Sequence, residues 1–174
     1  WDPRNLATRL TTVDLDQSAG VMMPFFDEDT GLLFVAGKGD GSVKYFEMIK
    51  EAPYAHFVDE YRTNNPQKGI DFLPKRCCDV GKCEIARALR LLREGIEPVP
   101  FVVPRKSEMF QDDIFPDCVS PLPPNNADAW MAGENKEPLR MSMRPGEGAA
   151  VAAPAANFVA QKSPACSPTL ITPI

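Results

Sequence analysis

Three neighbouring cysteines and the only histidine of the chain are the first residues to weigh for chemistry. Cys77, Cys78, Cys83 and His56 carry the thiolate and imidazole donors that Zn²⁺ prefers. Their spacing is not that of paired C-x-x-C knuckles, and His56 falls in an expected strand. His56 is also far in sequence from all three cysteines, which makes it a poor general base for a cysteine nucleophile. We therefore predict no metal, no cofactor and no enzymatic activity for this chain.

A glycine-rich segment, Gly37 to Gly41, resembles a phosphate-binding loop but lacks its key residues. Lys38 is followed by Gly39, where such a loop needs Ser or Thr. A hairpin turn is the better interpretation, because Asp40-Gly41 supplies the positive φ angles of a two-residue turn. Asp40 and Gly41 are therefore candidate structural anchors.

A short acidic segment, Asp27 to Gly31, has some features of a calcium loop. Gly31 comes one position too early for such a loop, however, and Lys38 stands where a bidentate glutamate is needed. We interpret the segment as an ordinary turn between two strands.

Basic side chains are the best candidates for binding a partner. The candidate set is Lys75, Arg76, Lys82, Arg87, Arg105 and Lys106, with Arg90 and Arg93 close by in the sequence. Such a patch would steer and hold an acidic surface. For any one residue a solvated surface charge is the alternative, so the hypothesis concerns the set.

Composition limits the class of protein. The 174 residues are 44% hydrophobic, which is enough for a globular core, but the eighteen prolines crowd toward the C-terminal third. A net charge of −5 of mixed sign argues against nucleic acid as a partner. No window is apolar enough for a membrane span. The five cysteines, an odd number, favour a reducing cytosol.

Short apolar runs separated by turn signals predict an all-β chain. The expected strands are 8–16, 21–26, 32–36, 43–48, 54–61, 69–73, 82–94 and 98–103. Residues 21–26 form a continuous apolar run that indicates an inner strand covered on both faces. Residues 82–94 fit a helix by local propensity, but the repeat needs a strand there, so we predict a strand.

Two aromatic-acid pairs indicate a repeat. Trp1-Asp2 and Phe46-Glu47 lie 45 positions apart, close to the length of one blade of a WD-repeat β-propeller. In such a blade the pair closes the third strand, which makes Phe46 a candidate anchor. The sequence thus predicts a partial propeller.

The segment from Arg105 to Met143 has scattered apolar residues among prolines and acids. We expect Phe110 to wedge against the propeller underside, with Asp112 and Asp113 capping turns; the alternative is an acidic partner contact. Trp130 is expected to be a second anchor, whose burial would contribute about 3 kcal/mol. Residues 145–174 are rich in Ala, Pro, Gly and Ser and are expected to be disordered.

Several motifs together resemble those of the coronin family, in the same order and over roughly positions 1 to 143. They are Trp1-Asp2-Pro3-Arg4-Asn5, Gly37-Lys38-Gly39-Asp40, Tyr45-Phe46-Glu47, Pro74-Lys75-Arg76, Lys82-Cys83-Glu84-Ile85-Ala86-Arg87, Pro104-Arg105-Lys106-Ser107, Phe110-Gln111-Asp112-Asp113, Pro116-Asp117 and Trp130. The motifs around Cys83 and Phe110 are the most specific.

This resemblance implies the last two blades of a seven-bladed WD-repeat propeller. It also implies that the propeller binds actin filaments and helps regulate the actin-nucleating complex of actin-related proteins. The implied location is the cytoplasm, at the actin cytoskeleton and cell cortex. The implied segments are the end of a preceding blade (1–20), a blade (21–64), the last blade without its outer strand (65–104), a packing extension (105–144) and a tail (145–174). The tail does not resemble the family's linker and coiled coil.

Two other classes stay open at this stage. One is a propeller adaptor that docks peptide partners without direct actin contact, and the other is an enzyme whose active centre lies in sequence before Trp1. Propeller blades are stabilised by stacking on neighbours, so we also expect these 174 residues alone to aggregate or to be partly molten.

Overall fold

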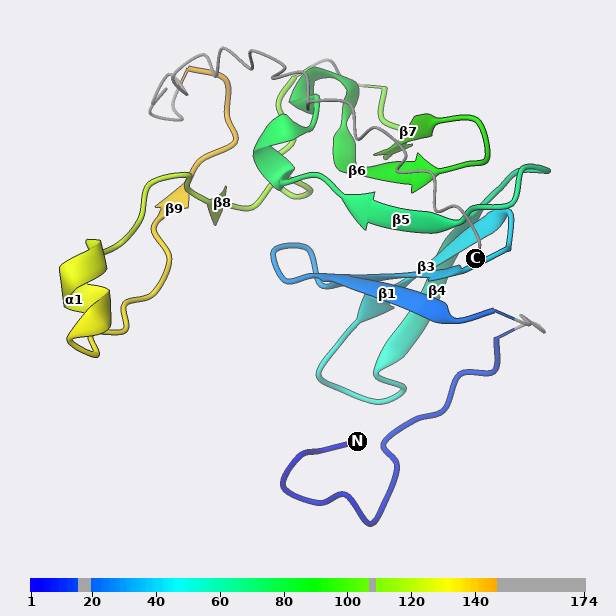
Figure 1. The fold of residues 1–174 in the computed structure, drawn as a ribbon, viewed down its shortest axis with the longest axis horizontal. Coiled ribbons are helices and arrows are strands. Elements are labelled where there is room, and N and C mark those ends of the chain that lie inside the picture. The colour runs from blue at the N-terminus through cyan, green and yellow to red at the C-terminus, as the bar shows by residue number, and fades with distance from the viewer. Residues whose placement is uncertain (16–19, 107–108, 147–174) are drawn as a thin grey trace, which may run out of the picture.

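The computed structural model describes residues 1–15, 20–106 and 109–146, and the regular secondary structure of this part is almost entirely β (Figure 1). A four-stranded antiparallel sheet has the order β1-β2-β3-β4, and a three-stranded one has the order β5-β6-β7. The first sheet comprises β1 (Met22–Asp27), β2 (Leu32–Gly37), β3 (Ser42–Met48) and β4 (Ala55–Arg62). The second comprises β5 (Gly69–Phe72), β6 (Glu84–Leu91) and β7 (Ile96–Val102).

The first sheet confirms the four strands predicted for one blade, with boundaries shifted by at most one residue. Phe34 and Ala36 of β2 and Val43 of β3 point into the core, as period-two alternation requires. β1 differs from the expectation of a strand covered on both faces, because Met22 and Phe26 are 38% and 50% exposed. The face of β1 that carries Met22 and Phe26 points away from the second sheet and is only partly covered by the described residues.

The turn between β2 and β3 is centred one pair earlier than predicted. Gly39, not Gly41, has the positive φ of +92°, and Asp40 N donates to Gly37 O at 3.2 Å. Gly41 is required for a different reason, since an added Cβ would lie 2.0 Å from the carbonyl oxygen of Thr63. The glycine there permits close approach of two backbones rather than an unusual dihedral angle.

The second sheet confirms a strand in the ambiguous segment 82–94. Two short 3₁₀ turns, η1 (Lys75–Cys77) and η2 (Val80–Lys82), connect β5 to β6. β6 then pairs with both β5 and β7, so backbone pairing on two sides overrides the helical propensity of the segment.

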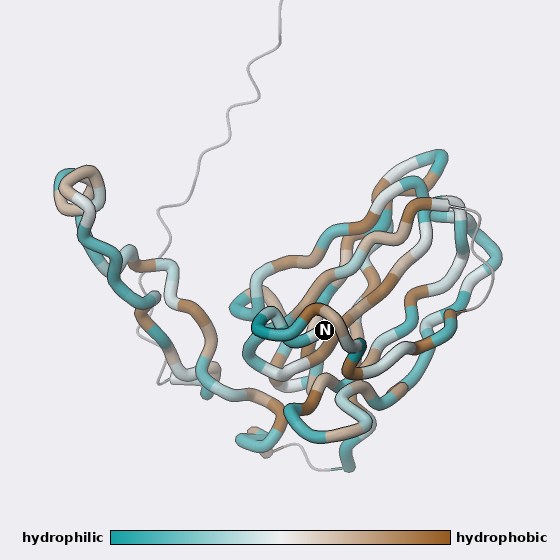
Figure 2. The backbone as a smooth tube through the Cα atoms, turned by 90° about the horizontal axis from the view of Figure 1, so that it is seen from below, coloured by the Kyte–Doolittle hydropathy of each residue, from teal (hydrophilic) through white to brown (hydrophobic). Residues whose placement is uncertain are grey.

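The core lies between the two sheets. Phe34 of the first sheet meets Phe101 of β7 edge-on, with ring centroids 4.9 Å apart, and Phe25 stacks on Phe72 at 4.2 Å. Apolar segments run along the strands, whereas the turns at the sheet ends are mainly hydrophilic (Figure 2). Each sheet therefore buries one face against the other.

Arg90 lies inside this core, which makes its interpretation as a surface charge wrong. Its side chain is fully buried and donates to Gln67 Oε1 at 2.9 Å, Glu97 Oε2 at 2.8 Å and Asn65 O at 2.7 Å. Gln67 Nε2 in turn donates to Gly37 O at 3.1 Å. A buried cation needs such partners, and here they connect the two sheets.

The strand predicted for residues 8–16 is not formed in the described part, residues 8–15. Thr11, Val13 and Leu15 instead line a hollow of about 170 Å³ with Val35 and Phe46, on the face of the first sheet that points away from the core. An extended segment becomes a strand only with a ladder partner, and no described strand pairs with this one.

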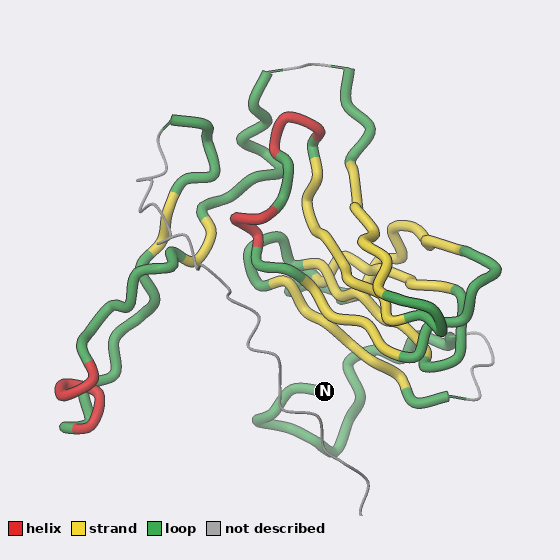
Figure 3. The backbone as a smooth tube through the Cα atoms, turned by 45° about the horizontal axis from the view of Figure 1, so that its top comes forward, coloured by secondary structure: helices red, strands yellow, loops and turns green. Residues whose placement is uncertain are grey.

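The extension leaves β7 and forms β8 (Cys118–Val119), α1 (Ala127–Met131) and β9 (Arg140–Met141). β8 and β9 pair as the base of an arm that projects from the sheets, with α1 at its tip (Figure 3). Phe110 packs against the core and stacks on Phe115 at 5.6 Å. Trp130 is 62% exposed, so the expectation that it is buried is wrong for the described residues.

Two further expectations concern the C-terminal tail and a membrane span. The predicted disorder of 145–174 lies outside the described residues, except for 145 and 146. Among the residues that the structure does describe, no helix has the length and apolarity needed to cross a bilayer.

Candidate functional site

The candidate basic residues lie at one end of the second sheet. Lys75 and Arg76 follow β5, Lys82 and Arg87 flank the start of β6, and Arg105 and Lys106 follow β7. Because β6 is antiparallel to β5 and β7, these three chain positions meet at the same end of the sheet. The topology therefore brings all six together, but their surroundings differ.

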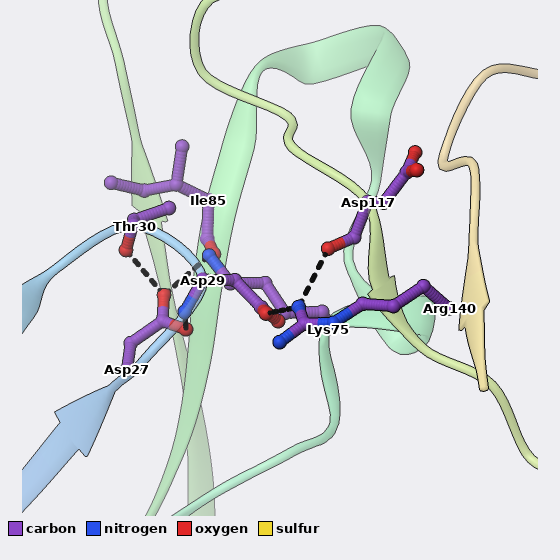
Figure 4. Close-up of polar contacts among 7 residues, drawn as sticks. All are labelled: Asp27, Asp29, Thr30, Lys75, Ile85, Asp117 and Arg140. Carbon is purple, nitrogen blue, oxygen red and sulfur yellow. Dashed lines mark hydrogen bonds and ion pairs between the residues drawn. The ribbon is translucent and has the colours of Figure 1, made fainter. Parts of the chain in front are cut away.

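Lys75 is not a surface charge. Its ammonium lies 2.5 Å from Asp27 Oδ2, and the two side chains are only 12% and 8% exposed. It also donates to Ile85 O at 2.8 Å, while Thr30 Oγ1 donates to Asp27 (Figure 4). Asp27 ends β1, so this ion pair clamps the first sheet to the second.

Arg140 connects the arm to the same place. Its guanidinium pairs with Asp29 in the β1–β2 turn and donates to Asp117 O at 3.0 Å (Figure 4). The acidic turn rejected as a calcium loop thus holds two cations from distant parts of the chain. We call Asp27, Asp29, Lys75 and Arg140 the inter-blade clamp.

Arg87 is also largely occupied by an internal partner. Its Nε donates to Glu84 Oε1 at 2.6 Å, and Nη2 contacts the other carboxylate oxygen. Glu84 is 1% exposed and also accepts from Asp79 N at 2.7 Å. The hydrogen bonds that Arg87 donates to Glu84 raise the pKa of Arg87, so the guanidinium stays charged while it satisfies a buried carboxylate.

Four of the six cations remain exposed. Lys82 pairs with Asp79 at 3.2 Å, which lowers the pKa of that carboxyl, and Arg105 pairs with Asp113 at 2.6 Å. Both pairs are solvent-accessible and hence weak. In the described ranges no carboxylate pairs with Arg76 or Lys106, so these two offer the most available charge.

The cysteines and the histidine are not arranged for chemistry. His56 lies on β4 at the edge of the first sheet, whereas Cys77, Cys78 and Cys83 lie in or beside η1 and η2, in the connection from β5 to β6 of the second sheet. Burial, together with the charge of Glu84, raises the pKa of Cys78 to about 11, which disfavours the nucleophilic thiolate. Across the described residues, no three His, Cys, Asp or Glu side chains are grouped to hold a metal ion.

Sequence reasoning missed the carboxylates and the arginine that hold the clamp. Asp27 and Lys75 are separated by more than forty residues, and Arg140 is farther still from Asp29. No local pattern predicts such pairs. The one available signal was the acidic turn itself, whose charges needed cationic partners once it was buried.

Comparison with known proteins gives related sequences. A family model described as a type of WD40 repeat matches residues 96–138, which span β7 and most of the extension. Coronin-A of Dictyostelium discoideum is 45% identical over 146 residues, covering 84% of this chain and 33% of Coronin-A. Coronin-2A of Mus musculus is 48% identical over 148 residues, covering 84% of this chain and 28% of the relative. The chain thus spans about a third or less of these relatives.

A solved structure agrees in fold. The WD40 domain of Toxoplasma gondii coronin superposes with a TM-score of 0.68 at 36% identity, covering 76% of this chain and 34% of that one. The fold class is therefore all-β, a partial WD-repeat propeller, and the two sheets are adjacent blades whose facing surfaces form the core.

Proposed function

Because this chain belongs to the coronin family, we propose that it is part of a non-enzymatic propeller that binds actin filaments in the cytoplasm, at the actin cytoskeleton and cell cortex. Regulation of the actin-nucleating complex is part of the same proposal. The residues proposed to meet the filament are Arg76, Lys82, Arg105 and Lys106.

The supporting observation is the collection of exposed cations at one end of a chain whose net charge is −5. Actin filaments are acidic, as the family resemblance implies, so these exposed cations carry the complementary charge. Lys75 and Arg87, which belonged to the sequence-based set, support this surface indirectly by fixing β5 and β6 beside it.

The test is cosedimentation of the full-length protein with actin filaments after charge reversal. Arg76→Glu with Lys106→Glu removes the two cations of this set that pair with no carboxylate among the described residues, and it leaves the clamp intact. Loss of two exposed charge contacts should weaken binding about tenfold at low salt and less as salt rises.

The matched control is Lys38→Glu with Arg93→Glu. Both residues are exposed and lie in turns at the opposite end of the blades, and the change in net charge is identical. Equal loss of binding in both double variants would indicate a bulk charge effect and would remove this surface from the filament interface.

A propeller adaptor that docks peptides is the second candidate. It is favoured by a hollow of about 620 Å³ between the blades, where apolar Leu32, Val58 and Ile114 lie beside acidic Asp29 and Glu47. An adaptor without direct actin contact would leave the full-length protein in the supernatant at every salt concentration.

A further inference from the structure

A third hollow, of about 320 Å³, lies where the arm returns to the second sheet. Arg76 and Cys78 line it from the β5–β6 connection, Cys118 lines it from β8, and Ser142 and Arg144 line it from the segment after β9. None of the clamp residues lines this hollow. It therefore brings a hydroxyl and two guanidinium groups to one place outside the contacts already described.

Ser142 is held at this position by its neighbours in the chain. Arg140 is fixed by Asp29 and Asp117 O, and β9 pairs with β8 immediately before Ser142. Ser142 Oγ accepts a hydrogen bond from Arg144 N at 3.1 Å. This bond uses a lone pair of the hydroxyl, and the side chain is partly exposed, so the oxygen is accessible to an enzyme.

The hollow has cations that a new negative charge can recruit. Arg76 is exposed, and no described carboxylate pairs with it. Arg144 pairs with Asp112 at 2.7 Å, but those side chains are 44% and 73% exposed, so the pair is weak. A doubly charged group at Ser142 would compete successfully with Asp112 for Arg144.

We propose that Ser142 is a phosphorylation site and that Arg76 and Arg144 hold the phosphate. In the reaction Ser142 Oγ attacks the γ-phosphorus of ATP, the bond to the β–γ bridging oxygen breaks, and ADP leaves. The hydroxyl proton passes to a base of the protein kinase. Arg140 and Arg144, two positions on either side of Ser142, give the site the sequence character of an arginine-directed serine kinase substrate.

The phosphate carries about −1.5 to −2 charges and three acceptor oxygens. Bound by Arg76, the phosphate joins the segment after β9 to η1 and fastens the arm to the second sheet by a contact that the unmodified protein lacks. Phosphorylation thereby orders residues 142–146 against the propeller.

The test uses the full-length protein with phosphoserine encoded at position 142. Its residue-resolved amide hydrogen exchange at 142–146 should be about tenfold slower than in the unmodified protein, the factor expected from one charge-assisted hydrogen bond. Arg76→Gln in the phosphorylated protein should abolish this protection. Phosphoserine at Ser120, which does not line the hollow, is the matched control and should leave exchange at 142–146 unchanged.

Two results would overturn the proposal. One is amide hydrogen exchange at 142–146 that the phosphate does not slow, or that it slows equally in the protein with Arg76 and in the Arg76→Gln variant. The other is failure of an arginine-directed serine kinase and ATP to phosphorylate Ser142 in the full-length protein, with Ser142→Ala as the blank for mass-spectrometric mapping.

Discussion

Replacing Lys75 with Met is predicted to be strongly destabilising, because it breaks the inter-blade clamp from one side. Methionine keeps an unbranched apolar side chain of similar length but removes the ammonium 2.5 Å from Asp27 and its bond to Ile85 O. Asp27, 8% exposed, is then a buried carboxylate whose remaining side-chain donor is Thr30 Oγ1. Breaking a buried pair in this way costs about 3–5 kcal/mol.

The assay is the free energy of unfolding of the full-length protein from urea titration, with the m-value checked for each variant. A second substitution, Asp27→Asn, removes the orphaned charge, and the double variant should regain about 2 kcal/mol relative to Lys75→Met. Such non-additivity is the signature of a direct pair rather than of two independent defects.

Lys82→Met is the matched control. Lys82 also pairs with an aspartate beside a 3₁₀ turn at the same end of the blade, but the side chains of that pair are 79% and 41% exposed. It should cost less than about 1 kcal/mol. If Lys75→Met costs no more than Lys82→Met, the reasoning that burial makes the Asp27–Lys75 pair structural is refuted.

Three further predictions concern a thiol, an exposed aromatic and a strand edge. The alkylation rate of Cys78 should keep rising with pH up to about 11, because the thiolate forms late. The stability contributed by the neutral thiol should be lost as the pH rises from the pKa of the thiol in the unfolded chain to its raised pKa in the folded protein. A rate plateau near pH 9 would contradict the raised pKa. Trp130→Ala should change the unfolding free energy by less than about 0.5 kcal/mol, and a loss near 3 kcal/mol would show that another part of the full-length protein covers this side chain. Replacing Pro98 and Pro100 with Val should accelerate heat-induced aggregation of the 174-residue chain, measured by light scattering, because it adds two donors to the outer edge of β7; unaltered scattering would count against the protective role of these prolines.

The strands were largely predictable and the long-range polar contacts were not. Runs such as 32–36 and 43–48 alternate with the period of a strand and end at turn residues, so local sequence carries the information. For 82–94, only the repeat argument favoured the strand that β6 forms. Residues 8–15 show the limit, because a threonine-rich segment without a described ladder partner stays irregular.

The burial of individual charged and aromatic side chains was harder to predict from the sequence. Arg90 and Arg93 are three positions apart and look equivalent in sequence, yet one is in the core and the other is exposed. Their difference depends on Gln67 and Glu97, which reach Arg90 only after the blades pack. Phe110 and Trp130 are likewise equivalent anchor candidates in the sequence, but Trp130 lies in α1 at the tip of the arm and is 62% exposed.

The outer edge of β7, which no described strand pairs with, provides the most direct test that these sheets are blades of a larger propeller. Val103 N donates to Cys83 O, on the side of β6, so the alternation of a strand points the amides of Val99 and Phe101 toward β6 as well. The amides of Ile96 and Val102 then point away from β6, on the side where a fourth strand would pair.

Residue-resolved hydrogen exchange on the full-length protein distinguishes the two cases. In a complete blade the Ile96 and Val102 amides bond to a further strand, so the account predicts that they exchange as slowly as those of Val99 and Phe101. Rapid exchange at Ile96 and Val102, with Val99 and Phe101 still protected, would mean that β7 ends the sheet and would contradict the propeller account.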